Sequence, residues 1–193
     1  FCTAVANVCA STTPDRALGE TWSAPAFGRV TYLGAQKWVV FIASGYNKFG
    51  SVYTGRTLYV VDAIAGTLLG RWDMEDVAYN VTTNPATIDN TVPGGPAVVD
   101  LDGNGYLDRV YIGDLEGRLW KLDVSQNATL GGDGYISTSV WPICKLFDAG
   151  DPDGNGATAR VWAPISTRPA VAVISNAQAN VYFGTGGDPK APS

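Results

Sequence analysis

The chain has 193 residues, of which 46% are hydrophobic and 16% are charged, so its composition is that of a globular protein rather than a disordered one. Its formal net charge is −5 and no stretch is strongly basic, which argues against nucleic acid or an anionic membrane surface as a partner. Histidine is absent, so the commonest general base is missing and we do not expect an enzyme. No apolar run approaches the ~18 residues that span a bilayer, so we expect no direct membrane insertion.

Residues 1–20 are small and polar, and they predict an irregular lead-in before a folded region at 21–193. The first residue is Phe1, which we interpret as the start of a processed chain or of a fragment. Cys2 and Cys9 could close a small loop in an oxidising compartment, or they could stay unpaired together with Cys144. The sequence leaves both possibilities open.

Short strands separated by turns are expected along the rest of the chain. The first four are predicted at 22–30, entered through Pro25, and at 38–44, 57–63 and 67–72. The run WVVFIAS at 38–44 has the length and composition of a strand buried on both faces. Further strands are predicted from Pro96 onward and at 109–113, 117–123, 169–173 and 180–184.

An internal repeat is the strongest architectural signal. The segment LYVVD at 58–62 aligns with LWKLD at 119–123, and Pro25, Pro96 and Pro169 open successive units at intervals of 71 and 73 residues. Repeating units made of strands are typical of β-propeller blades. We therefore predict an all-β fold, a partial β-propeller of four-stranded antiparallel blades with long inserted loops. The 6 Trp and 9 Tyr residues would pack between blades.

Three units are too few to close a ring of about 4–8 blades. The blade units begin near residues 25, 96 and 169, and the third has room for only part of a blade. We therefore expect the chain to be a segment of a larger propeller. Its first partner would be the remainder of that propeller, on the same chain or on another.

The loop DLDGNGYLD at 100–108 carries the most specific chemistry. Counting Asp100 as position 1, Asp102 and Asn104 occupy positions 3 and 5, Tyr106 offers its carbonyl at position 7 and Asp108 closes the set at position 9. Ca²⁺ accepts six to eight oxygen ligands in a flexible shell and uses this order of donors. These five residues are therefore the predicted Ca²⁺ ligands.

A plain turn is the alternative interpretation, because Asp, Asn and Gly favour turns. Three carboxylates within nine residues repel one another, however, and a divalent cation offsets that repulsion. Position 12 is Tyr111 rather than Glu, so the loop is not an EF-hand. A second acidic segment, DPDGN at 151–155, repeats only half of the pattern, and whether it is a second site stays open.

A set of motifs in a fixed order gives a resemblance to a known family: WSAP at 22–25, LYVVD at 58–62, the 100–108 loop continuing into DRVYIGD at 108–114, GRLWKLD at 117–123, TRP at 167–169 and FGTG at 183–186. Together they resemble the PilY/PilC family of type IV pilus tip-associated proteins over residues 17–188. The resemblance implies a modified C-terminal β-propeller with Ca²⁺ bound at Asp100, Asp102, Asn104, the Tyr106 carbonyl and Asp108.

The same resemblance implies a cell-surface protein that acts in pilus assembly, in the balance of pilus extension and retraction, and in twitching motility and adhesion. Its implied partners are minor pilins or other pilus tip proteins. Two other classes share parts of the pattern. A quinone-cofactor dehydrogenase propeller would need a metal at the propeller axis, and an integrin-like ligand-binding propeller would need acidic loops in several blades.

Overall fold

The structure is a computed structural model that describes residues 18–46, 54–73, 91–149, 163–175 and 178–186. Within these ranges the chain forms ten β-strands, and none of the described residues forms a helix long and apolar enough to cross a membrane. The strands are β1 (Ala26–Tyr32), β2 (Ala35–Ala43), β3 (Thr57–Asp62), β4 (Leu68–Asp73), β5 (Ala97–Val99), β6 (Arg109–Gly113), β7 (Arg118–Asp123), β8 (Ile143–Asp148), β9 (Ala170–Ser175) and β10 (Gln178–Tyr182).

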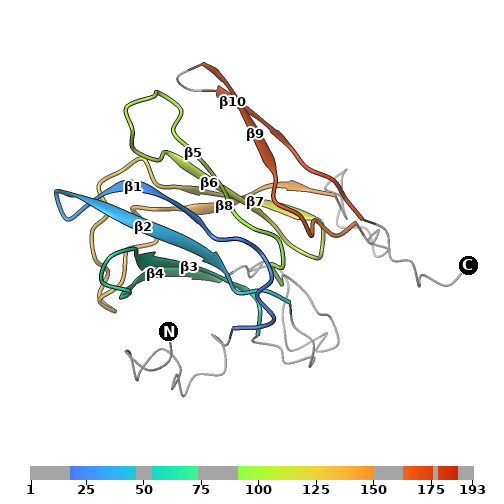
Figure 1. Cartoon of the computed structure of the whole chain (residues 1–193), viewed down its shortest axis with the longest axis horizontal. Helices are drawn as coiled ribbons and strands as arrows, with labels where there is room; N and C mark the ends of the chain where they lie inside the picture. The colour runs from blue at the N-terminus through green and yellow to red at the C-terminus, as the bar shows by residue number, and fades with distance from the viewer. Residues whose placement is uncertain (1–17, 47–53, 74–90, 150–162, 176–177, 187–193) are drawn as a thin grey trace, which may run out of the picture.

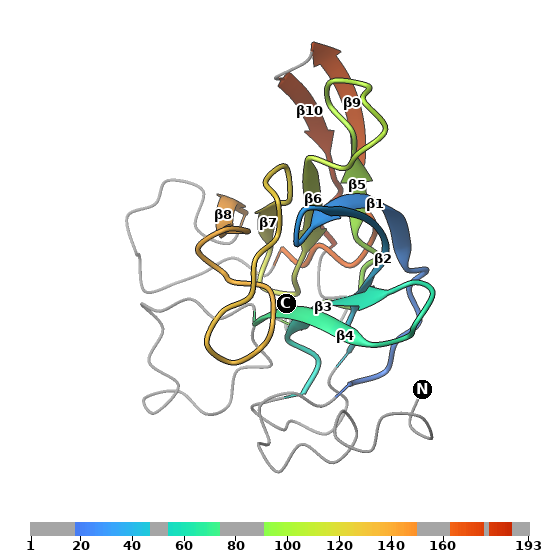
Figure 2. The same ribbon diagram turned by 90° about the vertical axis from the view of Figure 1, so that its left-hand side faces the viewer.

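The strands form three antiparallel sheets that follow one another along the chain (Figure 1). The first sheet has the order β1-β2-β3-β4, the second has the order β5-β6-β7-β8, and the third is the β9–β10 hairpin. The hairpin projects beyond the other two sheets in both views (Figure 2). The three described sheets leave the ring open, so this is the predicted partial β-propeller. The division of the chain at residue 20 stays a prediction, since residues 1–17 lie outside the described ranges.

Nine of the ten strands fall where the sequence predicts them, within a few residues. β1, β5 and β9 each begin one residue after the proline that opens a repeat unit. The strand that the sequence did not predict is β8, whose residues ICKLFD are exposed except at the two ends of the strand. Neither face of this strand is buried, so its sequence shows no alternation of apolar and polar side chains, and only its pairing with β7 identifies it.

The prediction that residues 38–44 are buried on both faces is wrong. Val39, Phe41 and Ala43 are buried, but Trp38 on the opposite face of β2 is 42% exposed. The strand buried on both faces is β3, the next one along the sheet. β2 is half exposed because one face of its sheet packs on the second sheet, while on the other face Trp38 contacts neighbours on the first sheet, such as the Phe27 ring and the Arg29 guanidinium, and stays partly open to solvent.

The main hydrophobic core lies between the first and second sheets. Inward side chains from β1, β2 and β3 meet those of β6 and β7, and residues of the long β7–β8 connection complete the contact. Trp72 and Trp141 stack with ring centroids 6.0 Å apart, and the Trp72 indole donates to the Trp141 carbonyl at 2.9 Å. The insertion between β7 and β8 is therefore part of the core rather than a surface decoration.

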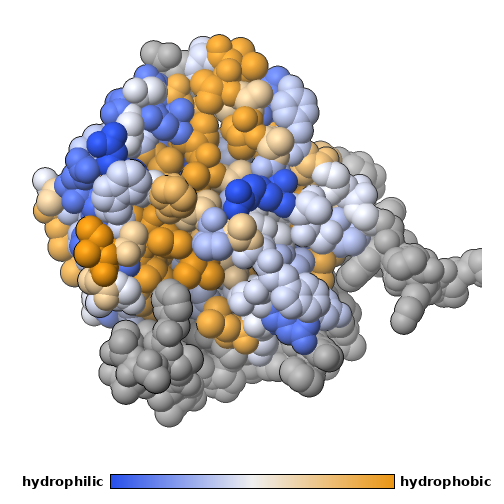
Figure 3. Space-filling model, viewed as in Figure 1, coloured by the Kyte–Doolittle hydropathy of each residue, from blue (hydrophilic) through white to orange (hydrophobic). Residues whose placement is uncertain are grey.

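Only some of the tryptophan side chains pack between the blades. Trp72, Trp120 and Trp141 are buried in the core, as predicted. Trp38 and Trp22 are not, and Trp22 is 75% exposed. Figure 3 shows a hydrophobic area that extends over the face in view from the β9–β10 hairpin, where Val173 and Ile174 are exposed.

The predicted alignment of the repeats is confirmed, because LYVVD ends β3 at Asp62 and LWKLD ends β7 at Asp123. Each of these two Asp residues pairs with a cation of the preceding strand, but the cations are not at equivalent positions, since Val39 lies opposite Asp62 whereas Arg109 lies opposite Asp123. Lys37 on β2 contacts Asp62 at the end of β3 at 2.5 Å, and Arg109 on β6 contacts Asp123 at the end of β7 at 2.7 Å. Asp62 also accepts hydrogen bonds from the amides of the turn that follows. The Lys37 ammonium and these amides lower the pKa of Asp62 from 3.8 to about 2.

A second carboxylate, Asp114, is fully buried in the turn between β6 and β7. It accepts hydrogen bonds from the amides of Glu116 and Arg118 and from the Trp120 indole. Gly117 closes the turn with φ 85°, a conformation that glycine adopts without steric cost. Removal of the carboxyl group from water raises the pKa of Asp114 to about 6, despite these donors and the nearby Arg118 guanidinium.

Replacement of Asp62 by Asn should lower the free energy of unfolding by about 1 kcal/mol at pH 7, a value reduced for the partial solvent exposure of Lys37. Because the folded pKa is below the unfolded value, the carboxylate stabilises the fold above pH 3.8 and loses this effect as the pH falls through 2. Urea unfolding followed by tryptophan fluorescence should show a difference at pH 7 that shrinks toward pH 2. A difference that does not change with pH would contradict this account.

The opposite dependence is expected for Asp114, whose folded pKa is raised. Its contribution is present below pH 3.8 and is lost as the pH rises through 6. Relative to an Asp114→Asn variant, the natural protein should therefore lose about 3 kcal/mol of stability between pH 4 and pH 7, since one pKa unit is worth about 1.4 kcal/mol. The same urea series measures this, and parallel curves for the two proteins would show that Asp114 titrates normally.

Candidate metal centre

The acidic loop, residues 100–108, connects β5 to β6 in the second sheet. β5 ends at Val99 and β6 begins at Arg109, so the loop is anchored at both ends by paired strands. Gly103 and Gly105 have φ angles of 75° and 86°, a backbone conformation that residues with a Cβ atom rarely adopt. Gly105, at position 6 of the loop, thus permits a sharp reversal of the chain. These two glycines fold the loop back on itself, so that residues at its start and end approach one another.

Three carboxylates converge in the loop. Asp100, Asp102 and Asp108 each offer an oxygen atom, and these atoms all lie within 4.8 Å of one another. Oxygens that bind one Ca²⁺ at about 2.3–2.6 Å can be no more than about 5 Å apart, so this spacing suits a common ion. Asp100 and Asp108 are half-buried, while Asp102 is exposed. The structure thus brings together all three acids that the sequence singles out.

Backbone amides of the loop fix the orientation of the first carboxylate. Asp100 accepts from the Gly103 amide through Oδ1 at 2.8 Å and from the Gly105 amide through Oδ2 at 2.7 Å. The Asn104 amide donates to Asp102 Oδ1 at 3.1 Å, and the Asn104 side-chain amide donates to Asp102 Oδ2 at 2.9 Å. Each bond uses one lone pair of an oxygen that has two, so the same oxygens can still bind a cation.

The two remaining predicted ligands offer carbonyl oxygens. Asn104 Oδ1 accepts from the Tyr106 amide at 2.7 Å. The Leu107 amide donates to the carbonyl of Arg29 on β1 at 2.8 Å. The Tyr106 carbonyl belongs to the same planar trans peptide group as the Leu107 amide, so the two point in opposite directions. The Tyr106 oxygen therefore points away from β1.

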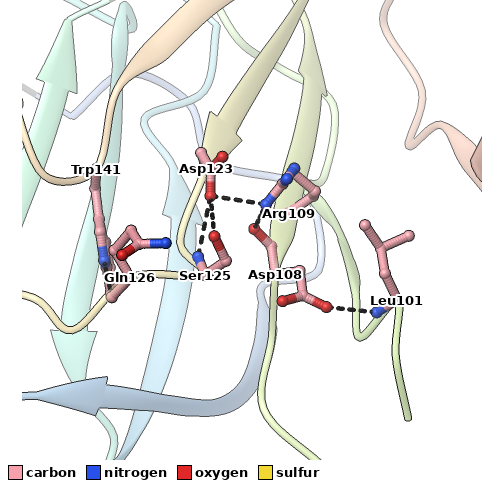
Figure 4. A network of polar contacts seen from close by, with 7 residues as sticks. All are labelled: Leu101, Asp108, Arg109, Asp123, Ser125, Gln126 and Trp141. Atoms are coloured by element: carbon pink, nitrogen blue, oxygen red, sulfur yellow. Dashed lines mark hydrogen bonds and ion pairs between the residues drawn. The ribbon is translucent and has the colours of Figure 1, made fainter. Parts of the chain in front are cut away.

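Asp108, the closing acid, is held by the strands of its own sheet (Figure 4). Its Oδ2 accepts from the Leu101 amide at 2.7 Å, which joins the two ends of the loop. Its carbonyl oxygen accepts from Arg109, and the same guanidinium nitrogen pairs with Asp123 Oδ1. The ion pair between Arg109 and Asp123 thus also fixes the backbone at the last predicted ligand.

The sequence did not predict that the loop contacts the first sheet. Arg29 donates from Nε to the Gly105 carbonyl at 2.9 Å, and its guanidinium lies 5.2 Å from the centroid of the Tyr106 ring. A Cβ atom on Gly28 would come within 2.5 Å of the Leu107 side chain, so Gly28 permits the close approach. Arg29 and Gly105 are 76 positions apart, and no local pattern connects them.

Other candidates lie apart from this loop. The segment 151–155 and the pair Cys2 and Cys9 fall outside the described residues, while Cys144 is an exposed free thiol. A cleft of about 690 Å³ lies where the segments that precede β1, β5 and β9 meet, and its lining includes Trp22, Tyr46 and Arg168. None of the residues that line this cleft belongs to the acidic loop.

Comparison with known proteins agrees with this architecture. A family model described as the PilY1 beta-propeller domain matches residues 9–191. The type IV pilus biogenesis factor PilY1 homolog of Xylella fastidiosa is 32% identical over 150 residues, which are 77% of this chain and 10% of the relative. The type IV pilus biogenesis factor PilY1 of Pseudomonas aeruginosa is 30% identical over 142 residues, which are 72% of this chain and 10% of the relative.

A solved structure shows the same fold. The crystal structure of the Pseudomonas aeruginosa PilY1 C-terminal domain superposes with a TM-score of 0.58 at 23% identity, and the match covers 90% of this chain and 33% of that one. The chain thus spans about a tenth of the length of the relatives and a third of the solved domain. Since the family model covers almost the whole chain, the chain belongs to the family of PilY1 β-propeller domains.

Proposed function

We propose that the chain is a calcium-binding, non-catalytic module of a type IV pilus biogenesis factor. In this proposal Ca²⁺ orders the acidic loop and so regulates pilus assembly and the balance of extension and retraction, which drives twitching motility and surface adhesion. The convergence of Asp100, Asp102 and Asp108 carries the proposal. The pilus role follows from membership of the family and from the names of the relatives.

Ca²⁺ suits the chemistry of the loop because every candidate ligand is an oxygen. Three carboxylates, the Asn104 side chain and the Tyr106 carbonyl make a hard, flexible donor set, and two of the five side chains are neutral. Mg²⁺ prefers strict octahedral geometry and keeps several waters, while Zn²⁺ prefers nitrogen and sulfur ligands. The half-exposed position of the loop leaves room for water to complete a shell of six to eight oxygens.

The same donor set explains how an ion would act as a switch. Without a cation, three carboxylates with oxygens within 4.8 Å repel one another and favour opening of the loop. A bound Ca²⁺ reverses the sign of that interaction, so it shifts the population toward the closed loop. The loop then presents one surface to a pilin-like partner when Ca²⁺ is bound and another when it is not.

Further blades of the same propeller are the second partner in the proposal. Phe27, Val98 and Val171 are the second residues of β1, β5 and β9, and they occupy equivalent places in the three units. Val98 packs on the core shared with the first sheet, and Val171 packs on the second sheet. Phe27 is 69% exposed and contacts Trp38. This face of the first sheet has the composition of an interface with a preceding blade.

The two alternative classes find less support in the geometry. A quinone-cofactor dehydrogenase would place its metal beside the cofactor at the propeller axis, but the described cleft between the units shares no residue with the acidic loop. An integrin-like propeller would carry acidic loops in several blades. Among the described connections, only that between β5 and β6 brings three acids together. The relatives' names favour an extracellular pilus-associated location at the cell surface.

Replacement of Asp108 by Asn should weaken Ca²⁺ binding at least tenfold, about 1.4 kcal/mol, because it removes one ligand charge. The amide keeps an oxygen for the Leu101 amide, so the loop should still fold. In calcium-free buffer the variant should melt at the natural temperature or above it, since one repulsive charge is gone. Calorimetric titration gives the affinity, and thermal unfolding with and without Ca²⁺ gives the stability.

Asp133→Asn is the matched control, because Asp133 is an exposed acid in another glycine-rich turn and also accepts an amide hydrogen bond. It changes the net charge by the same amount and should leave Ca²⁺ binding unchanged. Equal affinity of the Asp108 variant and the natural protein would refute the site. If neither protein binds Ca²⁺ at millimolar concentration, where extracellular modules typically bind, the calcium function itself fails.

A further inference from the structure

We propose that Arg29, on β1 of the first sheet, is a positioning residue of the acidic loop, and that Ca²⁺ occupancy therefore strengthens the contact between the first and second sheets. This inference rests on the calcium function proposed above, because it concerns the control of the same loop. It adds a residue from outside the loop and a structural consequence of binding. Neither follows from the ligand set itself.

Arg29 contacts the loop through its side chain and its main chain. Its Nε donates to the Gly105 carbonyl at 2.9 Å, and its own carbonyl accepts from the Leu107 amide at 2.8 Å. The guanidinium lies 5.2 Å from the centroid of the Tyr106 ring and 5.8 Å from that of Trp38. The Tyr106 hydroxyl lies 3.3 Å from Gln36 Oε1 on β2. The first sheet thus contacts the backbone on both sides of Tyr106 and also the Tyr106 side chain.

These bonds fix both peptide groups that flank Tyr106. The Gly105 carbonyl and the Tyr106 amide share one plane, which Arg29 Nε holds on one side and Asn104 Oδ1 on the other. The Tyr106 carbonyl and the Leu107 amide share the next plane, which the Arg29 carbonyl holds. The predicted ligand at position 7 therefore takes its orientation from a residue of the neighbouring sheet.

The acidic loop and β1 lie in close contact. A Cβ atom on Gly105 would come within 2.0 Å of the Arg29 guanidinium, and one on Gly28 would come within 2.5 Å of Leu107. β1 is an edge strand of its sheet, and the Arg29 carbonyl lies on its free edge. The Ala128 amide donates to Thr31 farther along that edge. Two connections of the second sheet thus cover the free edge of β1, the acidic loop and the connection between β7 and β8.

Thermodynamic linkage makes the effect reciprocal. If docking on Arg29 favours the closed loop, the apparent affinity for Ca²⁺ falls in proportion when docking is lost. By the same factor, bound Ca²⁺ must oppose detachment of the loop from β1. Calcium binding at the loop would in this way stabilise the arrangement of two blades, rather than only the order of nine residues.

The loss of charge and the loss of docking contacts at Arg29 predict opposite changes in the Ca²⁺ affinity. Removal of a positive charge near three carboxylates should by itself strengthen Ca²⁺ binding. Loss of the docking contacts should weaken it, because the ligand carbonyl is no longer held. An Arg29→Ala variant therefore distinguishes the two effects directly. Arg29→Lys keeps the charge and most of the side chain but loses the planar group that contacts both rings, so it should show an intermediate loss.

The experiment measures the Ca²⁺ dissociation constant by calorimetric titration for the natural protein, Arg29→Ala and Arg29→Lys. Arg71→Ala is the matched control, because Arg71 on β4 also lies over a tyrosine ring, that of Tyr135, at 4.7 Å but does not touch the loop. We expect about tenfold weaker binding for Arg29→Ala, a smaller loss for Arg29→Lys and no change for Arg71→Ala. Circular dichroism checks that each variant is folded.

Hydrogen exchange of single amides gives a second readout that does not depend on a substitution. In the natural protein, Ca²⁺ should slow exchange of the Leu107 amide about tenfold and change that of the Ala128 amide much less. Equal or tighter Ca²⁺ binding by folded Arg29→Ala, or no slowing of exchange at the Leu107 amide, overturns the inference while the calcium site stands. If the natural protein does not bind Ca²⁺, the proposed function fails first, and this inference fails with it.

Discussion

Apolar contact between the facing sides of the first two sheets holds the described part of the molecule together. Val30, Phe41, Leu58, Ile112 and Leu122 are almost fully buried there, and the stacked indoles of Trp72 and Trp141 extend the contact toward the outer strands. Burial of a large aliphatic side chain is worth about 1.5–3 kcal/mol, so this set outweighs any single polar contact in the fold. The blades can carry long and chemically different connections because their sheets are fixed by this core.

Polar contacts then fix the turns and loops that the hydrophobic core does not hold in place. The Asp that ends the third strand of each blade pairs with a cation of the second strand, Asp62 with Lys37 and Asp123 with Arg109, although the two cations occupy different positions along their strands. In the second blade Arg109 also holds the carbonyl of Asp108. This ion pair thus supports the last predicted ligand of the acidic loop. The pilus module that we propose would use one blade as a scaffold and one connection as a sensor.

The acidic loop is also more closely tied to its neighbour than its surface position suggests. It covers part of the free edge of β1, which an isolated sheet would leave open to pairing with another chain. Calcium control of that contact would couple a metal ion to the arrangement of blades. The apolar side chains of Phe27, Val173 and Ile174 are also exposed, and Val173 and Ile174, as consecutive residues of β9, point to opposite faces of the hairpin.

Local sequence determined the strands, the repeat and the candidate ligands, because each depends on residues close together in the chain. The alternation of Trp120, Leu122 and Val124 placed one face of β7 in the core, and the spacing of acids and glycines in 100–108 placed the loop between two strands. Tertiary structure decided the rest. It left Trp38 exposed and paired β8, whose sequence has no alternating pattern, with β7. It also brought Arg29 to Gly105 across 76 positions. These outcomes depend on which sheet packs against which. A local sequence pattern cannot show contacts between residues that only the folded structure brings together.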